Sequence, residues 1–114
     1  MSGGAFNHDQ YIISHITDII EDFVIKNEDN TEDEWGYTKG RHFRPSTIKQ
    51  FRVAILLLHI AQTFAQRIDW LVSDDDGEDT FHKRLQKEME MHVPDPDHRA
   101  ALYHALDNII QSMV

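Results

Sequence analysis

Apolar residues recur at helical spacing in four segments of this chain. In residues 8–26, five of them fall on one stripe when residues are placed at 100° intervals: Ile12, Ile16, Ile19, Ile20 and Phe23. Acidic side chains occupy the other side of the same segment, including Asp18 and Glu21. This pattern predicts an amphipathic helix over 8–26 that buries its apolar stripe.

The second segment, 46–72, is apolar almost all the way round. One side carries Phe51, Ile55, Leu58 and Ala65, and the opposite side carries Val53, Leu57, Ile60, Phe64 and Leu71. A helix with two apolar faces packs on two faces. We therefore predict that this helix is buried at the centre of the domain.

Two shorter helices follow. The first is predicted over 78–92, because it opens after Gly77 and because Pro94 disfavours helix at the residue before it. Asp95 and Pro96 then suit the N-cap and first position of a helix over 96–113. Nothing has the alternation of a strand, so we predict an all-α fold. It is a small helical bundle of about four helices in a single domain, 1–114.

The connection 27–44 is long for a compact domain, and such loops are usually functional or disordered. Its first half holds five carboxylates: Glu28, Asp29, Glu32, Asp33 and Glu34. Aromatic and basic residues follow: Trp35, Tyr37, Lys39, Arg41, His42, Phe43 and Arg44. The aromatic residues argue against simple disorder. Two hypotheses stay open, a loop docked over the core and a mobile loop that awaits a partner.

An acidic elbow joins the second and third predicted helices and contains Asp74, Asp75, Asp76 and Gly77. With Gly77 as the turn glycine of an EF-hand, the first and last ligand positions fall on Val72 and Lys83, which excludes that calcium site. We predict a structural turn in which Gly77 takes a positive φ and the aspartates favour the following helix N-terminus. The exposed carboxylates could also bind a protein partner.

Other candidate chemistry is weak. The histidine pairs lack the i, i+4 spacing of a helical metal site. Asp18, Glu21 and Asp22 form a DxxED pattern like those that hold magnesium in all-α nucleotide pyrophosphatases, but a second acidic motif is missing. We predict no catalytic residue, metal or cofactor. A divalent-metal-dependent hydrolase of small nucleotides stays as the alternative.

Asp69 lies on an apolar side of its helix, and a buried carboxylate needs a partner. We expect a salt bridge that ties the loop to the core, formed with one of three basic residues: Arg41, Arg44 or Lys83.

Charge and composition narrow the class of partner. The net charge is −9, with −8 over residues 1–36, +5 over 37–72 and −6 over 73–114. Such a surface repels phosphate backbones and attracts a basic protein surface. There are no cysteines, the first residues lack a signal-peptide pattern, and the longest apolar run is too short to span a membrane. The sequence predicts a cytoplasmic protein that binds neither nucleic acid nor membrane.

Two segments, "MSGGAFNHDQYIISHITDIIED" and "AQRIDWLVSDDDGEDTFHKRL", resemble a family of small uncharacterised phage and prophage proteins. The resemblance covers residues 1–26 and 43–88, so the helix within 95–114 looks like an addition. Family members usually have a glycine after the serine, where this chain has Asp74. The resemblance implies a mobile-element context, in which short acidic proteins often bind and disable or redirect a host protein.

We therefore predict a non-catalytic protein that binds a host or phage protein, such as an inhibitor of a host defence or nucleic-acid-handling system. Anti-CRISPR, anti-restriction and nucleic-acid-mimic proteins are of this type. The predicted partner-binding residues are Glu28, Asp29, Glu32, Asp33, Glu34, Trp35, Tyr37, Phe43, Asp74, Asp75 and Asp76. A homo-oligomeric structural or accessory protein is a further alternative, and homodimerisation is compatible with each hypothesis.

Overall fold

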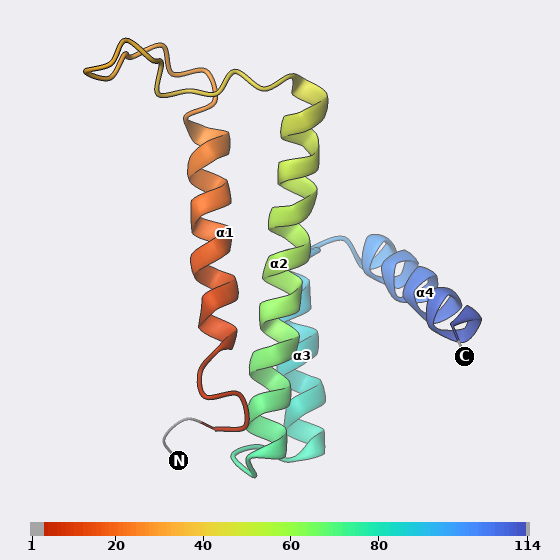
Figure 1. Ribbon diagram of the computed structural model, residues 1–114. Helices are drawn as coiled ribbons and strands as arrows, with labels where there is room; N and C mark the ends of the chain where they lie inside the picture. Colours follow the sequence, from red (N-terminus) through yellow and green to blue (C-terminus); the bar gives the residue numbers. More distant parts are fainter. Residues whose placement is uncertain (1–3, 114) are drawn as a thin grey trace.

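The computed structural model describes residues 4–113, and these form four α-helices (Figure 1). They are α1 (Gln10–Ile25), α2 (Pro45–Val72), α3 (Glu78–His92) and α4 (Pro96–Ser112). The predicted helices end within two residues of these bounds, and the all-α fold class is confirmed. Residues 1–3, which open the resemblance, and residue 114 lie outside the described part. None of the described helices has the length and hydropathy needed to cross a membrane.

α2 lies between two neighbours. α1 runs antiparallel along one side of it, α3 returns along another side, and α4 points away from the other three (Figure 1). Within residues 4–113, α1 and α3 do not approach each other. The first three helices thus form an open, layered bundle. The predicted central position of the second helix is confirmed.

The single chain is extended and has little core. Its radius of gyration is 18.1 Å, whereas a compact domain of this length has about 13 Å. Among the described residues, only two apolar side chains are fully buried, Ile48 in α2 and Met89 in α3. Much of the apolar surface that the sequence predicts to be buried is therefore open to solvent.

α1 meets α2 with a more polar face than predicted. The buried residues of this helix are Gln10 and Thr17, and the Thr17 hydroxyl donates to the backbone oxygen of Ile13 at 2.7 Å. The predicted stripe turns mostly to solvent, because four of its five members are exposed: Ile12, Ile16, Ile19 and Phe23. The prediction that α1 buries this stripe is wrong for the single chain, because helical periodicity identifies an apolar face without identifying what covers it.

The second apolar face of α2 is also incompletely covered. α3 ends at His92 and contacts only part of the 28-residue α2. Val53 and Leu57 are exposed, and Leu57 keeps 57% of its accessible surface. Burial of α2 on both faces is thus only partly realised.

Where α3 packs on α2, the contact is built around Trp70. The Arg67 guanidinium lies 4.3 Å and the Arg84 guanidinium 5.1 Å from the centre of its ring. Arg67 is buried, and its Nε lies 3.6 Å from a Glu88 carboxylate oxygen. These stacked cations join the C-terminal half of α2 to α3.

Asp69 is buried on α2, and its carboxylate is held by the segment that precedes α1. The backbone N–H of Ala5 donates to Oδ1 at 2.7 Å, and the Gln10 side-chain amide donates to Oδ2 at 3.2 Å. The Ser73 hydroxyl donates to Oδ1 at 3.4 Å. Within the described residues Asp69 has no ion pair, so the predicted salt bridge to Arg41, Arg44 or Lys83 is wrong.

This arrangement keeps Asp69 ionised. Burial alone would raise its pKa, but hydrogen bonds from Ala5, Gln10, Phe6 and Ser73 together hold the pKa below its ordinary value. Gly4 has φ +57°, and a Cβ built there would lie 2.5 Å from Asp69 Oδ1, so the close approach requires glycine. The segment before α1 and the C-terminal part of α2 therefore meet at this carboxylate.

The connection from α3 to α4 is rigidly built. Asp95 accepts a hydrogen bond from the Asp97 N–H at 2.8 Å, and Pro96 begins the helix, as predicted. The Arg99 guanidinium donates from Nη1 to the backbone oxygens of Val93 and Pro94, both at 2.8 Å. These bonds tie the first turn of α4 to the connection.

His92, at the end of α3, predicts a pH dependence of stability. Burial, followed by the charge of His59, lowers its pKa, although Glu88 acts in the opposite direction. The ring stacks on His59 at 5.7 Å between centroids, and its Nε2 lies 2.7 Å from the Thr63 hydroxyl oxygen. His59 in turn lies 3.1 Å from a Glu21 carboxylate oxygen.

A histidine with a lowered pKa binds fewer protons when folded than when unfolded, so its contribution to stability is present above pH 6.5 and is lost as the pH falls through the folded pKa. We expect the free energy of unfolding to decrease between pH 7 and about 5. Urea titrations at several pH values measure this slope. His92→Gln should flatten it, whereas the exposed His82→Gln should not, and equal slopes in the two variants would contradict the assignment.

Candidate functional site: the hairpin between α1 and α2

The connection between α1 and α2 folds into an irregular hairpin that projects beyond the ends of both helices (Figure 1). Its two sides pair through backbone hydrogen bonds: Lys39 N–H to Thr31 O at 2.7 Å, and Asp33 N–H to Tyr37 O at 2.8 Å. A single antiparallel bridge joins Glu32 to Thr38. The structure matches neither loop hypothesis fully, because the base of the hairpin packs against the helices while its tip extends away from them.

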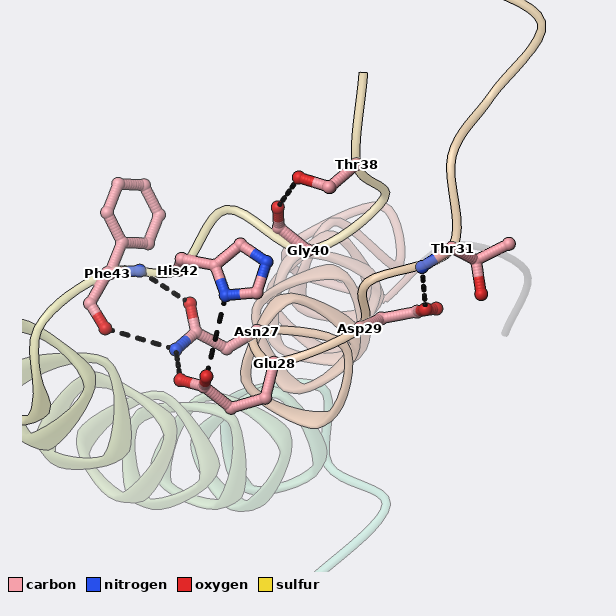
Figure 2. Close-up of polar contacts among 8 residues, drawn as sticks. All are labelled: Asn27, Glu28, Asp29, Thr31, Thr38, Gly40, His42 and Phe43. Atoms are coloured by element: carbon pink, nitrogen blue, oxygen red, sulfur yellow. Dashed lines mark hydrogen bonds and ion pairs between the residues drawn. The ribbon is translucent and has the colours of Figure 1, made fainter. Parts of the chain in front are cut away.

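Asn27 closes the base of the hairpin, as Figure 2 shows. This side chain is buried; its Oδ1 accepts from the Phe43 N–H at 2.9 Å, and its Nδ2 donates to Phe43 O at 3.1 Å and to Glu28 at 2.9 Å. The Asn27 backbone oxygen accepts from the His42 N–H at 3.0 Å. The other carboxylate oxygen of Glu28, Oε2, lies 3.4 Å from His42 Nδ1.

Two further features fix the base. Gly40 is buried there, and a Cβ added to it would lie 2.5 Å from the backbone oxygens of Asn27 and Lys26. The Phe43 ring packs against Phe51 of α2 with 5.6 Å between ring centroids. No local sequence pattern marks Asn27 or Gly40, because each closes the base through residues that lie 11 to 16 positions away in the chain.

Asp33 shapes the tip. Its Oδ1 accepts from the N–H groups of both Trp35 and Tyr37, at 2.8 and 3.0 Å, and Gly36 between them has φ +82°. The two aromatic side chains are left 76% and 72% exposed. A turn that is fixed by side-chain hydrogen bonds thus presents a tryptophan and a tyrosine to solvent.

The predicted partner-binding residues of the hairpin divide into three groups. Asp29 and Asp33 are structural acceptors, and the hydrogen bonds from Thr31 to Asp29 lower the pKa of that carboxyl. Glu28 and Phe43 belong to the base, as described above. Four exposed residues remain at the tip: Glu32, Glu34, Trp35 and Tyr37.

The acidic elbow lies at the other end of the molecule (Figure 1). α2, which separates it from the hairpin, spans about 42 Å at 1.5 Å per residue. Asp74 and Asp75 are exposed and Asp76 is half-buried. One compact partner site therefore does not include both the hairpin tip and the elbow.

The positive φ in the elbow belongs to Asp74, at +61°, whereas Gly77 has φ −100°. The prediction for Gly77 is wrong, because the reversal happens directly after α2 and not at the start of α3. Aspartate is among the few non-glycine residue types that tolerate this left-handed conformation.

The DxxED residues of α1 do not converge on a metal-binding arrangement. Glu21 faces His59 of α2, and Asp22 pairs with Lys26 at 3.1 Å on the same helix. Asp18 is exposed. Over residues 4–113, no group of three or more histidine or carboxylate side chains is placed to hold a metal ion.

Comparison with known proteins adds no relative: no protein-family model, curated protein or solved structure matches this chain.

Proposed function

We propose that this is a non-catalytic binding protein whose hairpin tip docks on a basic surface of a protein partner. The observation that carries the proposal is the exposure of Trp35 and Tyr37 on a turn that Asp33 fixes by two hydrogen bonds. When a partner buries a large, solvent-exposed aromatic side chain, the buried apolar area contributes strongly to the binding free energy. Tryptophan and tyrosine are accordingly enriched in binding hot spots.

The charge around these aromatic residues favours a basic partner. Glu32 and Glu34 are exposed beside them, and the chain as a whole carries −9. Complementary charge steers association and excludes acidic partners, nucleic acid included. The resemblance to phage and prophage proteins suggests a host protein that handles nucleic acid or defends against it, which this chain would inhibit.

Paired capture experiments test the proposal. The wild-type protein is immobilised beside Trp35→Ala and beside Glu32→Gln/Glu34→Gln, and a bacterial lysate is passed over each in parallel. Asp74→Asn/Asp75→Asn is the matched control, because it removes the same charge about 42 Å away. The affinity of each basic protein retained by the wild type is then measured with purified components.

We expect Trp35→Ala to weaken binding by about 30-fold, the effect of a hot-spot residue worth about 2 kcal/mol. Glu32→Gln/Glu34→Gln should weaken it less and reduce its sensitivity to salt. The elbow control should bind like the wild type. Equal affinity of Trp35→Ala and wild type for every retained protein would refute the assignment of the hairpin tip.

A further inference from the structure

An apolar face is left open on the layer that α1 and α2 form. We define this open face by six exposed side chains, four from α1 and two from α2: Ile12, Ile16, Ile19, Phe23, Leu57 and Ile68. At 100° per residue, the α1 row is about 140° from the Gln10–Thr17 row that meets α2. The α2 row faces away from Thr63 and Trp70, on the α3 side, and also from Gln66 and Asp69, which contact α1. Both rows are therefore turned away from α3, the α1 row toward the outer edge of α1 and the α2 row toward the outer edge of α2.

α4 carries a matching apolar row that its own chain does not cover. Leu106, Ile109, Ile110 and Met113 are exposed on one face of this helix. From Leu102, which begins the row, to Met113 is 11 residues, or about 17 Å along the helix. The α1 row from Ile12 to Phe23 has the same length, so one α4 fits along one open face.

α4 does not reach the open face of its own chain. The connection from α3 has three residues, 93–95, which span at most about 11 Å when fully extended. α3 lies on the opposite side of α2, a helix about 10 Å across with its side chains. The Arg99 hydrogen bonds tie α4 to this connection, and α4 points away from the layer (Figure 1). The helix that covers the open face has to come from another molecule.

We propose that two copies of this chain form a two-fold dimer in which α4 of each copy packs on the open face of its partner. Such an interface is reciprocal, so it covers both apolar faces of both copies and leaves none for further growth. It also supplies the core that the single chain lacks, where only Ile48 and Met89 are fully buried. The half-exposed side chains on the two faces offer several hundred Å² per copy, comparable to the about 800 Å² of a standard interface.

This dimer does not depend on the proposed function. The two proposals predict opposite effects of added salt. Each copy carries −9, so added salt screens repulsion between copies and strengthens dimerisation, while it weakens the docking of the hairpin on a basic partner. The hairpin variants Trp35→Ala and Glu32→Gln/Glu34→Gln should leave the oligomeric state unchanged. Failure of one proposal therefore does not imply failure of the other.

Sedimentation equilibrium of the full chain tests the dimer. At concentrations up to about 100 µM we expect a species of twice the 13.3 kDa chain mass. Ile109→Glu and Ile16→Glu should each raise the dimer dissociation constant by about 100-fold. Their matched controls, Gln111→Glu on the far side of α4 and His15→Glu beside the α1 row, should stay dimeric. A monomeric wild type, or a dimer that responds equally to Ile109→Glu and Gln111→Glu, would overturn the proposal.

Because a charged substitution on a helix can also destabilise the chain itself, a second measurement uses milder substitutions. The chain has no cysteine, so an Ile16→Cys chain and an Ile109→Cys chain can be mixed and treated with a short thiol crosslinker. We expect mixed crosslinked dimers to form at least ten times faster than in a mixture of Ile16→Cys with Gln111→Cys. Equal rates in the two mixtures would show that α4 does not pack on the α1 row.

Discussion

Met89→Ala is expected to lower the free energy of unfolding by about 2–4 kcal/mol. Met89 lies on α3, which packs on α2, and is only 2% exposed, so its truncation leaves a cavity among the residues that bury it. The effect is large for this protein, because the described chain buries only one other apolar side chain fully, Ile48. Urea unfolding followed by circular dichroism measures the loss, at one fixed protein concentration because dimerisation adds to apparent stability.

Met91→Ala is the matched control. It removes the same side chain two residues further along α3, where Met91 is 75% exposed. Surface substitutions usually change stability by less than about 0.5 kcal/mol. If both variants lose the same free energy, Met89 is not a core residue and α3 does not pack on α2 as described.

Helix bounds could be predicted from the sequence because the signals that set them are local. Pro45 at the start of α2, Pro94 after α3 and the Asp95–Pro96 pair act on the backbone within a residue or two of their own position. The order of the elements and the central place of α2 followed from these signals and from the two apolar faces.

Burial could not be predicted in the same way. The row Ile12 to Phe23 has the spacing of a buried face, yet α1 meets α2 through Gln10 and Thr17. Periodicity shows that a face favours removal from water, but not whether its own chain or another molecule removes it. The proposed dimer returns the apolar rows of α1 and α4 to the buried state that their sequence indicates.

The candidate site divides along the same line. The aromatic and acidic tip was predicted from composition, whereas the contacts that close the base of the hairpin join residues far apart in the chain. Asn27 binds Phe43 across 16 residues, and the Gly40 N–H binds the Asp29 backbone oxygen across 11. Such pairs exist only after the helices have packed, so no local pattern in the sequence predicts them.

Gly40→Ala is expected to open the base of the hairpin. Its φ is not positive, so the requirement for glycine comes from close packing alone. The new Cβ would lie 2.5 Å from the backbone oxygens of Asn27 and Lys26 and 2.7 Å from the Asp29 nitrogen. Because these are backbone atoms, they cannot move aside as the end of a flexible side chain can. Overpacking of this kind costs about 1–3 kcal/mol. Amide exchange of His42 and Phe43, whose N–H groups bind Asn27, should accelerate by at least tenfold.

Gly77→Ala provides the control. This glycine has φ −100°, and no described atom other than those of its chain neighbours lies within 4 Å of an added Cβ. Alanine fits this position and restricts the unfolded chain, but Gly77 is the N-cap of α3, where glycine is preferred to alanine. The two effects oppose each other, so stability should change by less than about 1 kcal/mol. If Gly40→Ala leaves the exchange of His42 and Phe43 as slow as it is in Gly77→Ala, the hairpin base is not closed by the Gly40 contact. The Asn27–Phe43 hydrogen bonds would then have to hold the tip in position by themselves.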